Sequence, residues 1–271
     1  MADSKRKQQK SAGLTIGFAV LGSLLLLFII LPLLGMLVGT SPAALLQALK
    51  DADVLASLGL TFYAAAWATG LAVITGVPLA YLLARNDFAG KNWVEGIINL
   101  PIVVPHTAAG IALLMLFGRY GFLGKAFGLV GLRFTDQVPG IVVGMLFVSL
   151  PFLVNAARDA FAAIDPELEA AAEADGASHW QVFLHITLPL AWRGIVGGML
   201  MMWGRGISEF GAVVILAYNP KIVPVLVYER FAGFGLSAAQ PVAVILILAS
   251  LVVFGLLQAV LIPRKEKTNR E

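Results

Sequence analysis

The chain has 271 residues, of which 59% are apolar and only 13% are charged, and its mean hydropathy is +0.88. Because a soluble domain carries about a quarter charged residues, this composition excludes a soluble enzyme, a disordered regulator and a coiled coil. The net charge of +3 does not indicate nucleic-acid binding, since basic residues among such apolar segments are typical of membrane boundaries. The absence of cysteine excludes disulfides, thiolate metal sites and cysteine nucleophiles.

Six apolar segments are long enough to cross a lipid bilayer as helices, which requires about 20 residues each. Their apolar runs are continuous rather than alternating, which favours helices over the strands of a barrel. We therefore predict an all-α integral membrane protein, with one transmembrane domain over residues 1–271. In chain order the expected spans are 14–38, 55–83, 96–117, 138–157, 195–217 and 241–262.

Three of these segments have features of their own. The first, 14–38, follows a basic amino terminus and so also fits a signal peptide, but its uncharged run exceeds a signal core of about 7–15 residues and we expect it to be retained. In the third, Pro101 and Pro105 remove backbone donors and are expected to kink or break the helix. The fifth is rich in glycine, which predicts close packing against neighbouring helices or a second subunit.

The placement of lysine and arginine predicts the orientation of the chain. With a cytoplasmic amino terminus, the inner segments hold twelve basic residues, which are Lys5, Arg6, Lys7, Lys10, Arg85, Lys91, Arg158, Arg193, Arg264, Lys265, Lys267 and Arg270. The outer segments hold six, which are Lys50, Arg119, Lys125, Arg133, Lys221 and Arg230. We therefore expect both termini, and the long connection 158–193, to lie in the cytoplasm.

This cytoplasmic connection, 158–193, carries the main functional signal. Asp165 and Pro166 are typical of a helix start and Gly176 of a helix end, so a short helix is expected between them. Ser178 and Gln181 then have the spacing of a capping box that opens a second short helix. The small alanines of the first helix would let another protein approach closely, although a self-packed loop or an interfacial helix on lipid fits the same composition.

Two stretches of this connection resemble the loop signature of prokaryotic ABC importer permeases. They read Glu169-Ala170-Ala171-Ala172-Glu173-Ala174-Asp175-Gly176 and, after nine further residues, Ile186-Thr187-Leu188-Pro189. Glu169 lies one residue earlier than in the commonest form of the signature. The resemblance implies the type I importer permease fold, in which this loop holds a coupling helix that sits in a groove of a cytoplasmic ATPase. It assigns the coupling role to Glu169, Ala170, Ala171, Ala172 and Gly176.

The resemblance extends over nearly the whole chain and points to an oxyanion branch of the family. The stretches 99–114, 203–214, 223–230 and 235–243 resemble molybdate/tungstate permeases. The Pro105-His106 pair and the Ile207-Ser208-Glu209 stretch are most similar to the tungstate permeases of archaea. Sulfate permeases share a related R-x-x-x-E-[FY]-G pattern, so sulfate or another oxyanion is the alternative substrate. The resemblance implies a homodimer in the cell membrane, two ATPase subunits that bind ATP and magnesium, and an external binding protein. The outer connection from Tyr218 to Gln240 is either its receiving surface or a re-entrant packing loop.

Five polar residues at membrane depth are candidates for the anion pathway or its gate: Arg205, Ser208, Glu209, His106 and Thr107. Arg205 and Glu209 are four apart, so they can pair on one helix face and partly neutralise each other. Since charges at this depth usually face the protein interior, the pair is either a structural clamp or part of the pathway. His106 and Thr107 follow the prolines, where they either accompany a kink that fits the helix to its neighbours or contact the oxyanion.

The chain lacks the motifs of several enzyme classes. It has no phosphate-binding loop, no nucleophile elbow and no metal-binding helix, and His179 and His185 would fall on different helix faces. We therefore expect this chain to hold no cofactor or metal and to hydrolyse no ATP by itself. An autonomous secondary transporter would show internal repeats and a membrane enzyme would cluster histidines or carboxylates, and the sequence shows neither pattern.

Overall fold

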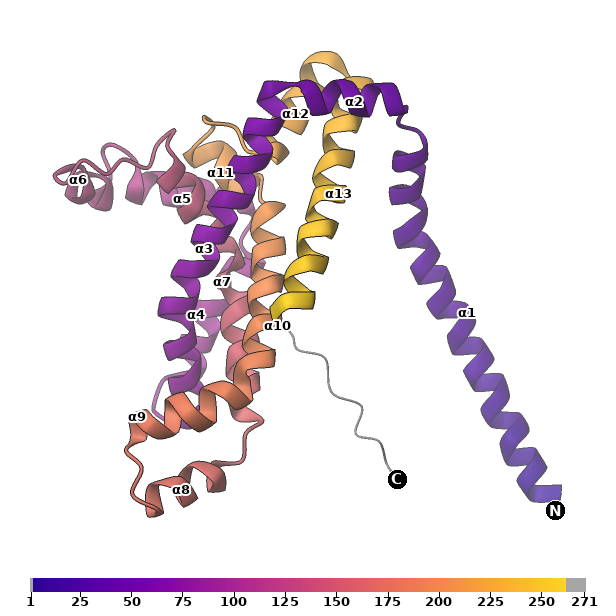
Figure 1. The fold of residues 1–271 in the computed structure, drawn as a ribbon, viewed down its shortest axis with the longest axis vertical. Coiled ribbons are helices and arrows are strands. Elements are labelled where there is room, and N and C mark those ends of the chain that lie inside the picture. Colours follow the sequence, from indigo (N-terminus) through magenta and orange to yellow (C-terminus); the bar gives the residue numbers. More distant parts are fainter. Residues whose placement is uncertain (1, 262–271) are drawn as a thin grey trace.

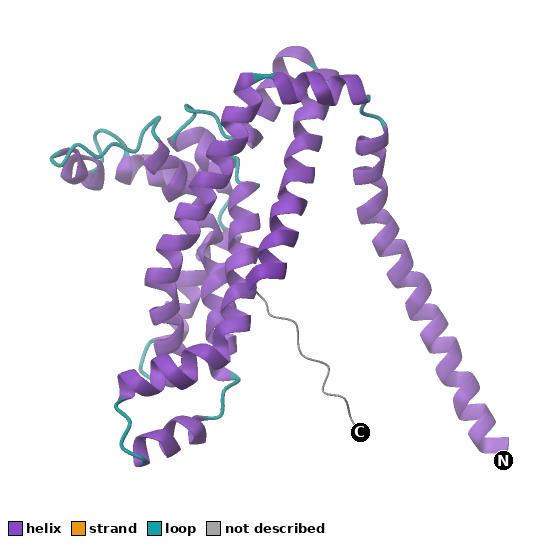
Figure 2. Ribbon diagram, viewed as in Figure 1, coloured by secondary structure: helices purple, strands orange, loops and turns teal. Residues whose placement is uncertain are grey.

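The computed structural model describes residues 2–261, with side chains from residue 14 onward, and every regular element in this part of the chain is a helix (Figure 2). Five helices are long and apolar enough to span a membrane, and a sixth span results if one bent pair is counted. The predicted all-α membrane fold is confirmed. The elements are α1 (Ala2–Val38), α2 (Pro42–Lys50), α3 (Ala52–Arg85), α4 (Lys91–Val103), α5 (His106–Phe117), α6 (Phe122–Gly128), α7 (Val138–Ala162), α8 (Pro166–Ala174), α9 (His179–Val182), the π-helical turn η1 (Phe183–Thr187), α10 (Leu188–Ile207), α11 (Gly211–Leu216), α12 (Val223–Phe234) and α13 (Leu236–Leu261).

The long helices α3, α7 and α10 form the packed body of the molecule, and α13 lies beside them (Figure 1). Helices α8 and α9 lie at one end of this body, which we call the coupling end. Helices α2 and α12 lie at the opposite end, which we call the distal end. Helix α1 stands away from the body, and its apolar stretch is fully exposed within this chain.

Small residues bring the central helices together. A Cβ atom added to Gly194 of α10 would lie 2.4 Å from the Cβ of Ala160 in α7, and one added to Gly198 would lie 2.7 Å from that of Ala156. No side chain fits at either glycine without a shift of the helices. Gly194 and Gly198 therefore serve close packing of α10 against α7, whereas Gly197 and Gly204 have open space around them.

Most of the predicted spans coincide with single helices: 14–38 with α1, 55–83 with α3, 138–157 with α7 and 241–262 with α13. Some residues used in the prediction lie outside the described part of the chain, namely Ile262, Arg264, Lys265, Lys267 and Arg270. The side chains of Lys5, Arg6, Lys7 and Lys10 are likewise not described.

The third predicted span, 96–117, is broken into α4 and α5, which are bent by 113° relative to each other. The break falls at Pro105, because proline has no N–H and disfavours helical geometry in the residue before it. Accordingly, Val104 is extended, with a ψ of 129°. Pro101 stays inside α4, so only one of the two prolines breaks the helix.

The fifth predicted span, 195–217, is wrong at both ends. A helical run begins earlier, at His179, and ends at Ile207, and α11 is a separate short helix. The Ser208 hydroxyl donates to the carbonyl of Arg205 (3.0 Å), and Glu209 Oε1 accepts from the amide of Ala212 (2.8 Å). Such side chain to backbone bonds compete with the helix ladder. Hydropathy missed the break because apolar residues continue on both sides of it.

Candidate functional site

Helix α8 begins and ends where the sequence predicts. The Asp165 carboxylate caps the start by accepting from the amide of Glu167 (3.0 Å). Gly176 adopts a φ of +94°, in the left-handed region that favours glycine, and so ends the helix. The amide of Ala177 then turns back to donate to the carbonyl of Ala172 (3.0 Å). The result is a rigid, sharply ended helix at the coupling end.

The outer face of α8 presents small and apolar side chains. Ala170 and Ala171 are exposed, Ala172 is half-buried, and the neighbouring Leu168 is 51% exposed. Small residues allow a partner's backbone to approach closely, and an exposed leucine adds apolar contact. This face therefore has the chemistry of a protein-docking surface.

Glu169 faces the body of the molecule rather than the docking surface. Its Oε1 accepts hydrogen bonds from Nη2 of Arg85 (2.9 Å), Nε of Arg85 (3.2 Å) and the hydroxyl of Thr187 (2.7 Å). The Arg85 and Glu169 side chains are only 12% and 13% exposed. Arg85 ends α3 and Thr187 ends η1, so Glu169 ties α8 to two other elements. We call this group the inner clamp.

The sequence marked Glu169 but missed its two partners. The only signals were the position of Arg85 at the cytoplasmic end of a predicted span and the place of Thr187 within the Ile-Thr-Leu-Pro stretch. Neither signal predicts that the side chains of Arg85 and Thr187 both contact Glu169, because residues 85 and 187 are far apart in the chain.

A π-helical turn joins the second short helix to α10. Ser178 and Gln181 form the predicted capping box at the start of α9. In η1 the amide of Leu188 donates to the carbonyl of Phe183, five residues back, in place of the usual four. Because Pro189 has no N–H, the α-helical ladder is incomplete at this point and a wider turn is accommodated. Such turns are frequent at functional sites.

A second group of polar side chains meets in the distal half of the molecule. Arg205 Nη2 lies 2.8 Å from Glu209 Oε2 and 2.8 Å from Nδ1 of His106, and this Nδ1 lies 3.1 Å from Glu209 Oε2. The hydroxyl of Ser208 lies 3.3 Å from Arg205 Nη1. We call these four residues the distal cluster. The structure thus joins four of the five candidate pathway residues, and the fifth, Thr107, is exposed beside His106.

The distal cluster is closed on one side and open on the other. The Glu209 side chain is fully buried, whereas the side chains of Arg205 and His106 are 21% and 36% exposed and Ser208 is exposed. Glu209 is also fixed by the amide of Ala212, so its charge cannot leave the guanidinium. The Arg205 guanidinium is neutralised by buried Glu209 on one side and is accessible on the other. A cation in this arrangement can contact a passing anion without binding it tightly.

Close backbone contact between α5 and α11 positions this cluster. A Cβ atom at Gly211 would lie 2.7 Å from the Cβ of His106, and one at Gly110 would lie 2.9 Å from the carbonyl oxygen of Ala212. The two breaks in the membrane helices, before α5 and before α11, are therefore packed against each other. This contact brings His106 to Arg205 from a distant part of the sequence.

At the distal end, the connection after α11 folds into α12, which packs on the body through buried Val223, Val225 and Leu226. Hydrogen bonds from Lys221 (2.7 Å) and then Tyr218 (2.7 Å) hold the pKa of the Glu229 carboxyl below its ordinary value. A hydrogen bond from Arg230 does the same for the pKa of Asp51, just before α3. The Arg230–Asp51 pair fixes α12 against the start of α3, and the bonds to Glu229 fix the preceding connection to α12.

The sequence matches the family described as binding-protein-dependent transport system inner membrane component over residues 76–267. A molybdate/tungstate transport system permease protein of Thermococcus kodakarensis is 41% identical over 243 residues, covering 89% of this chain and 93% of the relative. Its counterpart in Pyrococcus furiosus is 43% identical over 243 residues, covering 89% and 92%. A probable sulfate transport system permease of Zygnema circumcarinatum is 28% identical over 251 residues, covering 90% and 87%.

Solved structures show the same fold at low sequence identity. A chain of a bacterial alginate ABC transporter, crystallised with an alginate-bound periplasmic protein, superposes with a TM-score of 0.68 at 17% identity and covers 88% of this chain and 91% of that one. A chain of the MetNI methionine ABC transporter superposes with a TM-score of 0.57 at 17% identity, covering 76% and 91%. Fold, family match and close relatives agree, so the chain belongs to the inner-membrane components of binding-protein-dependent transport systems, the multi-pass permease subunits of ABC importers.

Proposed function

We propose that this permease moves molybdate or tungstate, delivered by an external binding protein, across the cell membrane. The permeases named for molybdate/tungstate are 41% and 43% identical to this chain, whereas a relative named for sulfate is 28% identical. All three anions are tetrahedral and doubly charged, so they differ mainly in size.

The observation that carries the transport role is the geometry of the distal cluster. Arg205 is held 2.8 Å from a fully buried Glu209 and stays accessible beside Ser208. An anion that passes this face gains attraction from the Arg205 guanidinium, which lies beside the His106 ring. Glu209 offsets the positive charge, so release stays fast. Because the open side of the cluster lies at the surface of one chain, the pathway is completed by a second copy in a homodimer.

The energy for transport comes from two cytoplasmic ATPase subunits, which bind ATP and magnesium. The exposed face of α8 with Ala170 and Ala171 is the docking surface for one ATPase subunit on each permease copy. Glu169 does not contact the ATPase in this proposal; it transmits the motion of α8 to α3 and α10 through Arg85 and Thr187. Both termini lie in the cytoplasm with α8, and the binding protein docks at the distal end.

Uptake by the reconstituted complex tests the proposed substrate. Vesicles that contain the permease, its ATPase and its binding protein are supplied with radiolabelled molybdate, and unlabelled tungstate, molybdate or sulfate competes. We expect tungstate and molybdate to block uptake of the label at far lower concentrations than sulfate. Equal competition by sulfate would refute the assignment and leave a general oxyanion permease.

A further inference from the structure

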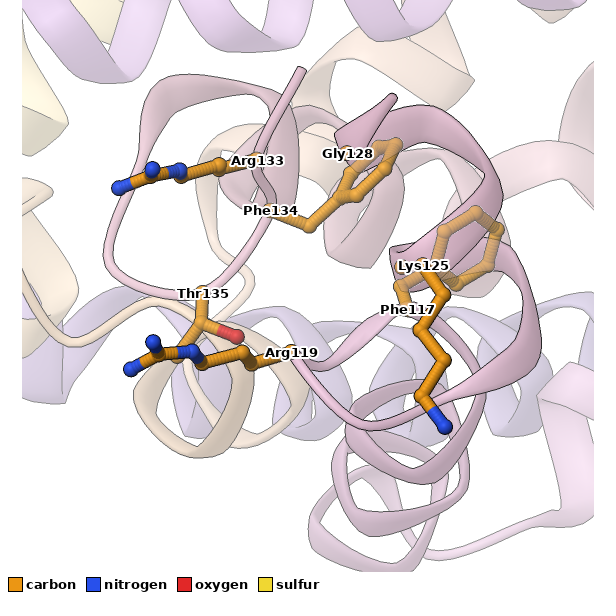
Figure 3. Close-up of a pocket in the computed structure, with 8 residues that line it drawn as sticks. Phe117, Arg119, Lys125, Gly128, Arg133, Phe134 and Thr135 are labelled. Atoms are coloured by element: carbon orange, nitrogen blue, oxygen red, sulfur yellow. The ribbon is translucent and has the colours of Figure 1, made fainter. Parts of the chain in front are cut away.

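A basic cavity of about 400 Å³ lies where α5 ends and the chain turns into α6. None of the residues that line it belongs to the inner clamp or to the distal cluster. Its lining includes Arg119, Lys125, Arg133 and Thr135 (Figure 3). The size is within the range of cavities that bind small ligands or headgroups, about 300–1,000 Å³. No acidic residue lines it.

The walls of this cavity are built from tight turns and stacked rings. A Cβ atom at Gly124 would lie 1.9 Å from the carbonyl oxygen of Gly118, so the start of α6 folds directly onto the end of α5. Phe134 is buried between Phe117, with ring centroids 4.8 Å apart, and Phe127, with centroids 5.5 Å apart. The cavity is therefore a fixed feature of the fold.

The three cations of the cavity are unpaired. Within residues 14–261, no hydrogen bond or ion pair is formed by the side chains of Arg119, Lys125 or Arg133, whereas Arg85 and Arg230 are both paired with carboxylates. In Figure 3 the two arginines extend to the same side with Thr135 between them, and Lys125 extends from another wall. Together they are three of the six basic residues in the expected outer connections. Three unpaired cations around one cavity favour the binding of an anion.

Exposed apolar side chains lie on the same segment of the chain as the residues that line the cavity. Tyr120, Phe122, Leu129 and Val130 are 83%, 78%, 89% and 79% exposed. Helix α6 lies beside the distal half of the body, at the level of α11, and not beyond α2 and α12 (Figure 1). Cations next to exposed aromatic and aliphatic residues at the side of a membrane bundle are typical of the headgroup region of the bilayer.

We propose that this cavity binds the phosphate group of an anionic phospholipid. The guanidinium groups of Arg119 and Arg133 and the ammonium group of Lys125 contact the phosphate oxygens, and the exposed apolar residues contact the acyl chains. A free tetrahedral oxyanion is also negatively charged but makes no contact with apolar side chains, which favours the lipid as the source of the anion. The assignment does not depend on which anion the permease transports.

Lipid titration of the purified full-length chain in detergent, followed by native mass spectrometry, tests this site. The probes are short-chain phosphatidylglycerol and phosphatidylcholine with the same acyl chains. The variants are R119Q, K125Q and R133Q, and the control is K50Q, which removes an exposed lysine at the end of α2. We expect phosphatidylglycerol to bind more tightly than phosphatidylcholine, and each cavity variant to weaken its binding by roughly fivefold, the effect of one basic residue near an anionic surface.

Three results would overturn the proposal. Equal binding of the two lipids would show that the headgroup charge is not recognised. Equal effects of K50Q and the cavity variants would place the recognition elsewhere. Displacement of the lipid by free phosphate or molybdate at a similar concentration would assign the cavity to a soluble oxyanion, and unchanged lipid binding in the presence of these anions supports the lipid.

Discussion

Two arginine–carboxylate pairs sit at different levels of the molecule, and their surroundings differ. In the inner clamp, the Glu169 carboxylate bonds to Arg85 and Thr187 and is 13% exposed, so it joins three separate elements. In the distal cluster, the Glu209 carboxylate is fully buried, and its partner Arg205 lies four residues away, at the end of the preceding helix. The first pair thus links three separate elements, and the second is a neutralised cation with one accessible side.

This difference shows how one chemical pair serves two purposes. A carboxylate that bridges distant elements transmits displacement, because breaking it separates those elements. The Glu209 carboxylate also contacts His106 of α5, but its main partner, Arg205, lies four residues away, so its chief effect is to set the charge of that cation. The variants below separate these roles, beginning with the largest expected effect on stability.

The largest loss is expected for Glu209→Gln. The substitution leaves the Arg205 guanidinium without its counter-charge in a mostly buried place, and breaking such a pair costs about 3–5 kcal/mol. We expect a strongly lowered unfolding free energy in detergent and little uptake in vesicles. Glu173→Gln is the control, because the Glu173 side chain is 39% exposed and its contact with His179 contributes at most about 1 kcal/mol.

A double variant, R205M/E209Q, decides between the two roles that the sequence left open for this pair. Replacing both charged partners by neutral residues recovers much of the stability, since no unpaired charge remains. If Arg205 contacts the anion, uptake stays low in the stable double variant. Normal uptake in the double variant would show that the pair is only a structural clamp.

An intermediate effect is expected for Glu169→Gln. The variant keeps the shape of the side chain but loses the charge in its bonds to Arg85 and Thr187, at a cost of about 1–3 kcal/mol. We expect the ATPase to copurify with the permease while uptake falls. Glu167→Gln, an exposed carboxylate in the first turn of the same helix, is the matched control. Loss of the ATPase from E169Q but not E167Q would mean that Glu169 belongs to the docking surface after all.

A smaller effect on stability is expected for Gly176→Val. The glycine has open space around it, so the cost is conformational and comes from its φ of +94°, which disfavours other residues by about 1–2 kcal/mol. We expect the end of α8 to shift and the ATPase to dissociate or uncouple. Gly90→Val is a close control, because Gly90 has a φ of +95° and open space but lies between α3 and α4. Normal ATPase copurification together with normal uptake by G176V would contradict this role.

The smallest perturbation comes from single cysteines, which test the orientation of the two regions. The chain has no cysteine of its own, so Ala171→Cys in α8 and Lys50→Cys at the end of α2 each introduce one reactive thiol at an exposed position. A membrane-impermeant maleimide added to intact cells is expected to label K50C and not A171C, with no change in stability. The opposite pattern would invert the proposed orientation.

The coupling end was more predictable from the sequence than the distal cluster, for a physical reason. The start, end and caps of α8 depend on residues that are neighbours in the chain, such as Asp165 and Gly176. The partners of Glu169 and of Arg205 come from other helices, and no local pattern specifies that Arg85 or His106 will meet them. The expected fifth span failed because hydropathy does not register a break that is made by Ser208 and Glu209 bonding to the backbone.

In the proposed mechanism α8 drives the membrane helices through the inner clamp, and the number of ATP molecules hydrolysed per anion taken up measures this coupling. This ratio is measured in vesicles with the wild-type complex and with the E169Q complex, each with its binding protein. We expect the ratio to rise severalfold in E169Q, because the ATPase still docks on α8 but α3 and α10 no longer follow its motion. An unchanged ratio with normal uptake would show that the inner clamp does not transmit the motion.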